Sequence, residues 1–277
     1  MKTAIHTIIK NEPDEYLKVW LNHHTKMVDH IFIFEDIDSW SHKHLTDKYD
    51  NVTLLSGADI CSKQSLLDNK ANGRDNQRPL LKEGVMYIKG LNQYDWLFTL
   101  DIDEFITLQP PYKAISDVLG AFQDKDGVLL QWMNYGASGR IYKPNYNGRD
   151  YREFYTIPAN DTNWDEQAKA NTKIAWNLNL ITRWNVTGLH CLAGNWTKTN
   201  GEKNRKKKVY DKMYLSHYIT RSWEEYIWKR YIRGMHSGNR HRNDDDFFEV
   251  NPDMLPIKDK LLTIKEKILK DYGKEFT

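Results

Sequence analysis

The chain has 277 residues, with 40 basic and 38 acidic side chains and a formal net charge of +2 at pH 7. This length can bury a core without disulfides or metals, and a composition of 40% hydrophobic and 28% charged residues excludes a disordered chain. The small net charge argues against a nucleic-acid partner. No apolar run reaches the roughly 18 residues of a membrane span, and the N-terminal segment lacks the apolar core of a signal peptide. With only two cysteines, the sequence predicts a cytoplasmic protein.

The first half of the chain alternates between strand and helix patterns. Short apolar runs rich in β-forming residues predict strands at residues 3–9, 30–34, 52–55, 96–100 and 128–133. Apolar residues at helical spacing predict helices over residues 16–27, 79–91 and 112–122. Strands joined by helical crossovers predict an α/β fold with a mainly parallel sheet flanked by helices. Ligands of such sheets bind beyond the carboxyl ends of the strands.

The second half has a different pattern. Residues 140–175 are rich in Asn, Asp and Tyr with little periodicity, which is typical of a long functional or mobile loop. Strand-like runs follow at 175–182 and 213–219, and Ser222 with Glu225 forms a capping-box pattern at the start of a helix over 222–233. Near the C-terminus, apolar residues on one face predict a helix that docks on the domain; they are Ile257, Leu261, Ile264 and Ile268.

An acidic motif, Asp101-Ile102-Asp103-Glu104-Phe105, follows the apolar strand predicted at 96–100. Because side chains alternate along a strand, we expect Asp101 and Asp103 to share one face. Two carboxylates this close repel each other unless a cation lies between them or one is protonated. Mg²⁺ and Mn²⁺ prefer oxygen ligands, and Mg²⁺ is commonly held by one or two carboxylates together with substrate phosphates. The motif therefore predicts a divalent metal site, with a solvated acidic turn as the alternative.

Other short motifs accompany the acidic motif in a characteristic order. They are Lys10-Asn11-Glu12, Phe34-Glu35-Asp36, Asp95-Trp96-Leu97-Phe98, Gln131-Trp132, Tyr135-Gly136-Ala137-Ser138-Gly139, His217-Tyr218 and Arg221-Ser222. This set, spread over residues 5–235, resembles glycosyltransferase family 92 and the family 2-like group, which includes bacterial capsule and cell-surface polysaccharide enzymes. The resemblance implies a GT-A fold, a UDP-sugar or similar nucleotide-sugar donor, Mn²⁺ or Mg²⁺ as cofactor, and inversion at the anomeric carbon.

The resemblance also implies roles for individual residues. Asp101 and Asp103 would bind metal and diphosphate, with Asp103 favoured for direct ligation, and His217 or His190 would complete the metal shell. A purely structural role is the alternative for His217, a lone histidine at a strand end. Residues at the ends of the first two strands would contact the nucleoside; they are Asn11, Glu12, Glu35 and Asp36. Helix capping is the equal alternative for the first two of these. Three cations could reach the diphosphate: Arg78, Lys229 and Arg233. A solvated basic face is the alternative for the last two.

An inverting transfer also needs a general base on the acceptor hydroxyl. The candidates are Glu104, Asp165, Glu166, Glu224 and Glu225, of which Glu225 is discounted by its capping pattern. Three further residues would lie near the acceptor cleft: Trp132, Tyr135 and Ser138. Trp132 equally suits a plain hydrophobic core.

A basic run contains Lys203, Arg205, Lys206, Lys207 and Lys208. It suits a solvated loop, or contact with an anionic membrane surface by an enzyme whose acceptor is lipid-linked. Peripheral membrane contact is therefore one of two readings of this run.

The sequence predicts a single GT-A domain. Residues 1–139 would form its nucleotide-sugar-binding half, 140–235 its acceptor-side half and 236–277 a C-terminal helical extension. The expected activity is metal-dependent, inverting transfer of a hexose or N-acetylhexosamine to a glycan or lipid-linked acceptor in surface polysaccharide synthesis.

Two other classes stay open. A non-catalytic carbohydrate-binding module could use the ten tryptophans of the chain. A haloacid-dehalogenase-like phosphatase also places Asp-x-Asp after apolar residues, but it normally has Thr or Val where this chain has Phe105.

Overall fold

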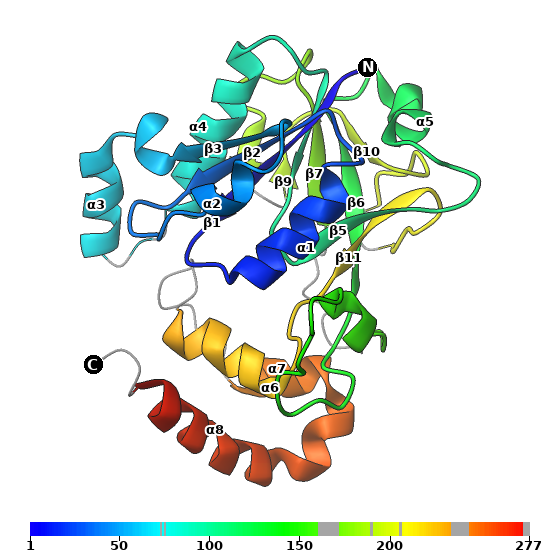
Figure 1. The fold of residues 1–277 in the computed structure, drawn as a ribbon. Helices are drawn as coiled ribbons and strands as arrows, with labels where there is room; N and C mark the ends of the chain where they lie inside the picture. Colours follow the sequence, from blue (N-terminus) through cyan, green and yellow to red (C-terminus); the bar gives the residue numbers. More distant parts are fainter. Residues whose placement is uncertain are drawn as a thin grey trace. The chain divides into compact units, whose positions relative to one another are not determined.

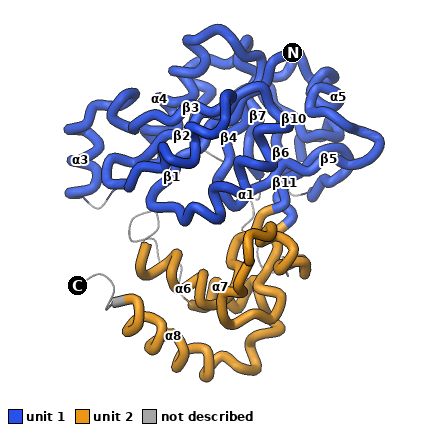
Figure 2. The backbone as a smooth tube through the Cα atoms, in the orientation of Figure 1, with its two compact units in different colours: residues 1–133, 168–216 blue, residues 134–167, 217–277 orange. Residues whose placement is uncertain are grey.

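The computed structural model describes residues 1–72, 74, 76–159, 172–188, 191–204, 207–233 and 244–273. The chain divides into two compact units, which Figure 2 shows in different colours. Unit 1 comprises residues 1–133 and 168–216, and unit 2 comprises residues 134–167 and 217–277. Each unit has a hydrophobic core of its own.

A nine-stranded sheet dominates unit 1 (Figure 1), with strand order β3-β2-β1-β4-β7-β6-β11-β5 and β10 paired to β6. Its strands are β1 Thr3–Ile9, β2 His30–Glu35, β3 Val52–Ser56, β4 Trp96–Thr99, β5 Glu104–Leu108, β6 Gly127–Asn134, β7 Thr172–Asn177, β10 Trp196–Lys198 and β11 Met213–His217. The pairs β1–β2, β2–β3, β1–β4 and β6–β10 are parallel. Strand β7 is antiparallel to both of its neighbours, β4 and β6.

Helices flank this sheet (Figure 1). They are α1 Asp14–His24, α2 Lys43–Thr46, α3 Lys63–Ala71, α4 Gln77–Gly90 and α5 Ile115–Leu119, with the 3₁₀ turns η1 Gly57–Asp59 and η2 Gly120–Phe122. A short hairpin pairs β8 Val186–Gly188 with β9 Cys191–Leu192. The predicted α/β class is confirmed, and so are all five strands and three helices predicted in the first half.

One strand prediction in the second half needs correction, and two strands of the sheet were not predicted. The strand expected at 175–182 is β7, which begins at Thr172 and ends at Asn177, because residues 178–180 form a turn. Strands β5 and β10 carry no predicted counterpart, since β5 follows the acidic motif at once and β10 has only three residues.

Helix α4 explains how one face of the sheet is covered. Its buried residues Leu81, Val85 and Ile88 join a cluster with Ala4 of β1 and Phe34 of β2. Apolar residues at spacings of three and four place one stripe of the helix against the sheet. The apolar spacing within residues 79–91 therefore determines which face of α4 packs on the sheet.

Unit 2 is mainly helical. It contains η3 Tyr151–Phe154, α6 Trp223–Ile227, the π-helical turn η4 Trp228–Ile232, α7 Asp244–Val250, η5 Pro252–Ile257 and α8 Lys258–Gly273. The predicted capping box at α6 is confirmed, because Ser222 Oγ accepts from the Glu225 N–H at 3.2 Å and the Glu225 carboxylate accepts from the Ser222 N–H at 3.2 Å.

The predicted C-terminal helix is confirmed as α8. It buries Leu261 and Ile268 in the core of unit 2, and Trp223 Nε1 donates to the Leu261 carbonyl at 2.9 Å. Ile257 belongs to η5 and is 37% exposed, so it does not share that buried face. None of the helices described combines the length and apolar composition that crossing a membrane requires.

Candidate functional site

The carboxyl ends of β1, β2 and β4 lie at one edge of the sheet in unit 1. Parallel pairing places Ile9 opposite Glu35, and the Asp36 N–H donates to the Ile9 carbonyl at 3.0 Å. On the other side of β1, the Leu100 N–H donates to the His6 carbonyl at 3.1 Å. The predicted residues that follow these strands are therefore brought to the same edge; they are Asn11, Glu12, Glu35, Asp36, Asp101 and Asp103.

The acidic motif forms a turn. Strand β4 ends at Thr99, Ile102 and Asp103 occupy the turn, and β5 begins at Glu104. The expectation that Asp101 and Asp103 share one strand face is therefore wrong. The Glu104 N–H donates to the Asp101 carbonyl at 3.1 Å, and Glu104 Oε2 accepts from the Asp101 N–H at 2.9 Å. These two hydrogen bonds join the first and last residues of the turn.

A buried lysine from β7 supports this turn. Lys173 Nζ donates to Asp101 Oδ2 at 2.8 Å and lies 3.6 Å from Glu104 Oε1. The Lys173 and Glu104 side chains have no exposed surface, whereas the Asp101 side chain is 39% exposed. Asp103 is buried at 4%. Lys173 thus neutralises part of the negative charge of the motif from inside the sheet.

The environment shifts the pKa values of this group in opposite directions. Burial raises the pKa of Glu104 well above its ordinary value, although the nearby Lys173 opposes the shift. Burial lowers the pKa of Lys173, but the negative charges of Asp101 and Glu104 outweigh it and hold the pKa above its ordinary value. Lys173 therefore keeps its charge at neutral pH. Glu104 is fully buried and accepts a hydrogen bond from the Asp101 N–H, so its environment suits a structural role in stabilising the turn.

His6 lies beside this group on β1. It is 1% exposed, and burial lowers its pKa to about 4, so its ring is neutral at pH 7. Helix α4 passes so close that a Cβ added to Gly84 would lie 2.3 Å from His6 Nε2. The glycine in the middle of α4 is therefore explained by the close approach of the helix to this ring.

Asn11 holds a loop that follows β2. Its backbone has φ of +49°, its N–H donates to Ser39 Oγ at 2.9 Å, and its Oδ1 accepts from the Trp40 N–H at 2.9 Å. Helix α1 has Pro13 at its N-cap and no side-chain capping bond. Capping of α1 by Asn11 or Glu12, the alternative from sequence, is therefore wrong.

His42 connects Glu12 with Glu35. Its Nδ1 and backbone N–H contact Glu35 Oε1 at 2.8 and 2.7 Å, and its Nε2 lies 2.8 Å from the Glu12 carbonyl oxygen. Burial lowers the pKa of His42, but the hydrogen bonds with Glu35 and Glu12 outweigh it and hold the pKa above its ordinary value. The contact fixes one oxygen of Glu35 at the end of β2.

Asp36 is bound on several sides. Its Oδ1 accepts from Asn76 Nδ2 at 3.0 Å and from the Ile37 N–H at 2.8 Å, and its Oδ2 lies 3.2 Å from Lys70 Nζ. Asn76 is the N-cap residue of α4, two residues before Arg78. The start of α4 is thus tied to the end of β2, where the nucleoside contact is predicted.

Three more of the predicted residues belong to unit 2: His217, Lys229 and Arg233. His217, the last residue of β11, is 5% exposed, and its Nδ1 lies 2.9 Å from Asn134 Oδ1. With Asn134 Oδ1 accepting from Nδ1, the lone pair of the neutral ring is on Nε2, and a metal binds the nitrogen that carries the lone pair. Lys229 lies in the π-helical turn η4 and Arg233 ends it, where the Arg233 N–H donates to the Trp228 carbonyl at 3.0 Å. Their spacing is therefore that of a π-turn, and the expected α-helical face is wrong.

Two of the base candidates in unit 2 have structural bonds. Glu225 accepts from Tyr146 Oη at 2.6 Å and from Ser222 Oγ at 2.6 Å, and Glu224 Oε2 accepts from the Lys143 N–H at 2.8 Å. Asp165 and Glu166 lie outside the described residues, as do His190, Arg205 and Lys206.

Of the residues predicted near the acceptor cleft, Trp132 is 7% exposed, as its core alternative requires. Tyr135 stacks on Tyr218, with ring centroids 4.9 Å apart. Ser138 Oγ accepts from the Ile157 N–H at 3.1 Å.

Sequence reasoning missed several residues of the site. Lys173 lies within the stretch 140–175 that reads as a loop, and His42 lies in an irregular segment after β2. His6 reads as one more residue of an apolar strand. A lone buried lysine in a strand pattern is the one signal that could have pointed to Lys173, because a buried charge requires a partner.

Comparison with known proteins identifies the family of the chain. The model of glycosyltransferase family 92 matches residues 87–275, well over half of the chain. The chain belongs to glycosyltransferase family 92. Membership confirms the predicted resemblance and, with the sheet topology, the predicted GT-A type of fold. No curated protein sequence matches the chain.

Solved structures show weaker likenesses. A mycobacterial protein has 12% identity and a TM-score of 0.37, with 65% of this chain and 54% of that chain covered. The galactosyltransferase LgtC, in complex with donor and acceptor sugar analogs, has 13% identity and a TM-score of 0.33, with 90% and 95% covered. The 4-diphosphocytidyl-2C-methyl-D-erythritol synthase of Anaerococcus prevotii has 12% identity and a TM-score of 0.26, with 65% and 72% covered. The family 92 chain thus spans about half the length of the mycobacterial protein.

Proposed function

We propose that this family 92 protein is a metal-dependent, inverting glycosyltransferase. It moves a hexose or N-acetylhexosamine from a UDP-sugar to a glycan or lipid-linked acceptor in surface polysaccharide synthesis. The observation that carries the proposal is the gathering of carboxylates at the carboxyl edge of β1, β2 and β4 in a chain of this family. Membership in the family favours this activity over a phosphatase or a carbohydrate-binding module.

The residues present fit a divalent metal whose remaining ligands come from the phosphates of the donor. Among the described residues, no three His, Cys, Asp or Glu side chains gather as a metal-binding group. Mg²⁺ commonly needs only one or two carboxylates, because water and substrate phosphates complete its shell. Asp103 and the part-exposed Asp101 are the carboxylates we assign to it, and ligation by His217 stays a prediction. When bound, the metal would neutralise charge on the departing nucleoside diphosphate.

The side chains of unit 1 would orient the donor. Glu35, whose Oε1 is held by His42, and Asp36 are proposed to accept hydrogen bonds from the ribose hydroxyls or the uracil N–H. Lys173 keeps the Asp101–Glu104 turn folded before the donor arrives, so little reorganisation remains for the reaction. As the acceptor oxygen bonds to the anomeric carbon, the bond to the diphosphate breaks and the acceptor proton passes to a carboxylate base.

The first test combines donor binding with turnover. With Mn²⁺ or Mg²⁺ present, UDP at a hundredfold excess over its Kd should stabilise the protein by about 2.7 kcal/mol, measured by thermal unfolding. Asp103→Ala should abolish this metal-dependent shift and lower the release of UDP from a UDP-sugar by about a hundredfold or more. Asp124→Ala removes a carboxylate that is 70% exposed and serves as the matched control.

Three outcomes would contradict the proposal. Wild-type turnover in Asp103→Ala would exclude this carboxylate from the reaction. Release of free phosphate in place of UDP would indicate the phosphatase alternative. A protein that no nucleotide stabilises, with or without metal, would indicate a binding module.

A further inference from the structure

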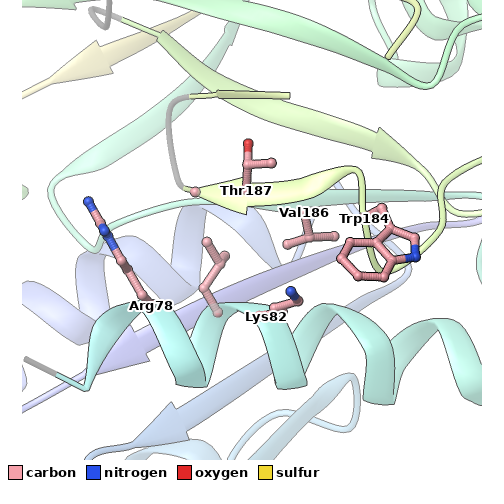
Figure 3. A pocket seen from close by; sticks show the side chains of 7 residues that line it. Arg78, Lys82, Trp184, Val186 and Thr187 are labelled. Carbon is pink, nitrogen blue, oxygen red and sulfur yellow. The ribbon is translucent and has the colours of Figure 1, made fainter. Parts of the chain in front are cut away.

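A pocket lies within unit 1, between α4 and the segment that enters β8. Its volume is about 280 Å³. Arg78, Leu81 and Lys82 of α4 line one side, and residues 184 and 186–188 line the other. Figure 3 shows Arg78 and Lys82 extending from the helix, with Trp184, Val186 and Thr187 coming from the opposite segment.

Trp184 gives this pocket an aromatic surface. Its side chain is 85% exposed, the largest exposed fraction among the large hydrophobic residues described. The turn that carries it is anchored, because Arg183 Nη1 donates to Glu83 Oε2 of α4 at 2.9 Å and the Thr182 N–H donates to Asn185 Oδ1 at 2.7 Å. An indole ring held in water by an anchored turn is available to stack on a ligand.

Among the described residues, the two cations of the pocket have no acidic partner. Arg78 and Lys82 are four residues apart on α4, which places their Cβ atoms about 5–6 Å apart on one face of the helix. Neither forms an ion pair with any carboxylate in the part of the chain that the structure describes. The nearby acidic residue Glu83 is bound to Arg183. The lining therefore carries two positive charges and no negative one, and an arginine matches the planar shape of a carboxylate or phosphate.

One end of the pocket lies near the sheet edge where the donor is proposed to bind. Asn76, two residues before Arg78, donates to Asp36 at the end of β2 at 3.0 Å. Arg78 thus stands near the carboxyl edge of the sheet, and Lys82 follows one turn further along α4. A ligand in this pocket would extend away from the donor site along the helix.

We propose that this pocket binds an acidic saccharide, with a pyranose ring stacked on Trp184 and its carboxylate or phosphate bound by Arg78 and Lys82. The inference rests on the proposed function, since it assigns the pocket to an acidic sugar of the acceptor. It also gives Arg78 a different anion from the donor diphosphate predicted from sequence.

The test measures saccharide binding by calorimetry in the absence of nucleotide. The probes are a tetrasaccharide of alternating glucuronic acid and N-acetylglucosamine, the neutral chitotetraose, and glucose 1-phosphate. At least one anionic probe should bind tenfold or more tightly than chitotetraose, and its binding should weaken as salt is raised. Preference for the uronate or for the phosphate identifies which anionic group the pocket takes.

Variants locate the binding. Trp184→Ala and Lys82→Met should each weaken binding of the anionic probe at least tenfold. Lys18→Met, on the exposed face of α1, and Tyr142→Ala, an aromatic side chain that is 55% exposed, should leave it unchanged. Thermal unfolding checks that each variant folds, as expected for a side chain as exposed as Trp184.

The proposal is overturned if neither anionic probe binds, if chitotetraose binds as tightly, or if the pocket variants bind like the wild type. It is also overturned if Trp184→Ala loses affinity for UDP, because the pocket would then belong to the donor. Failure of the proposed function gives a different result. In that case UDP has no metal-dependent effect, whatever the saccharides do.

Discussion

At the scale of single residues, the site depends on a cation that the fold supplies from a distant strand. Lys173 is 72 positions from Asp101 in the chain and donates to it at 2.8 Å. Its neighbour Glu104 has no exposed surface. A buried charge without a partner is far less stable than the same charge in water. Lys173, Asp101 and Glu104 therefore stabilise one another as a set.

Removing the lysine should reveal this dependence. Lys173→Met leaves the carboxylates of Asp101 and Glu104 without their cation, and we expect a loss of about 3–5 kcal/mol in the free energy of unfolding. Without Lys173, Glu104 must either take up a proton or stay charged without a cation, since burial raises its pKa. Adding Glu104→Gln removes this cost and should restore part of the loss, while the part-exposed Asp101 stays solvated. Urea unfolding of the single and double variants measures both effects.

Lys198 provides the matched control, because among the described lysines its side chain is nearly as buried as that of Lys173, at 1% exposure. Lys198 Nζ donates to Gln131 Oε1 of β6 at 3.3 Å. Lys198→Met should also destabilise the protein, but Glu104→Gln should give no recovery there. Equal recovery in both backgrounds would show that Lys173 and Glu104 are not coupled.

At the scale of elements, α4 shows how a helix is fitted to a sheet. Sequence periodicity predicts the helix and its apolar stripe, because both follow from local spacing. It does not predict why Gly84 stands in the middle, where glycine destabilises a helix by about 1 kcal/mol relative to alanine. The structure gives the reason in the ring of His6, which leaves no room for a Cβ.

Glycine substitutions in α4 should therefore differ by position. Gly84→Ala should lower the free energy of unfolding by about 1–3 kcal/mol through overpacking against His6. Gly90→Ala, where an added Cβ meets nothing within 4 Å, should be neutral or slightly stabilising. Denaturant unfolding compares the two variants in one helix.

A double-mutant cycle tests whether the His6 ring causes the destabilisation by Gly84→Ala. In a His6→Ala background the ring is absent, so Gly84→Ala should lose most of its effect. The same loss in both backgrounds would place the strain elsewhere, for example at Phe34, whose ring would lie 3.2 Å from the added Cβ.

At the scale of the molecule, the chain has two hydrophobic cores. The core of unit 1 is formed by the sheet and α4, and the core of unit 2 by α6, α7 and α8 around Trp223. Regions with separate cores can open with separate free energies. The nucleoside and metal residues that we propose at Asn11, Glu12, Glu35, Asp36, Asp101 and Asp103 all belong to unit 1.

A cavity in the second core should therefore have a local effect. Leu261 of α8 has no exposed surface, and Leu261→Ala should lower stability by about 2–5 kcal/mol. Hydrogen exchange should accelerate in α6 and α8 more than in β1 and β2. Leu255→Ala, at a side chain that is 49% exposed, is the control and should change exchange little. Uniform acceleration across both units would show that they unfold together.

The sequence by itself determined the kind and order of most elements and the carboxylates of the site. Strand and helix patterns are local, so residues 3–9 and 79–91 could be assigned without a structure. Polar residues after parallel strands meet at one edge, so Glu35, Asp36 and Asp101 could be named as well. The expectation that Asp101 and Asp103 share one strand face was wrong, because the hydrogen bonds between Asp101 and Glu104 that form the turn leave no periodic pattern in the sequence.

Only the tertiary structure decided what surrounds those carboxylates. Strand β7 enters the sheet antiparallel between β4 and β6, and this pairing brings Lys173 beneath the acidic motif. His42 reaches Glu35 from a loop, and Trp184 lies opposite Arg78 across a pocket. Such contacts join residues far apart in the chain, and they follow from strand pairing and packing. Local sequence patterns do not encode them.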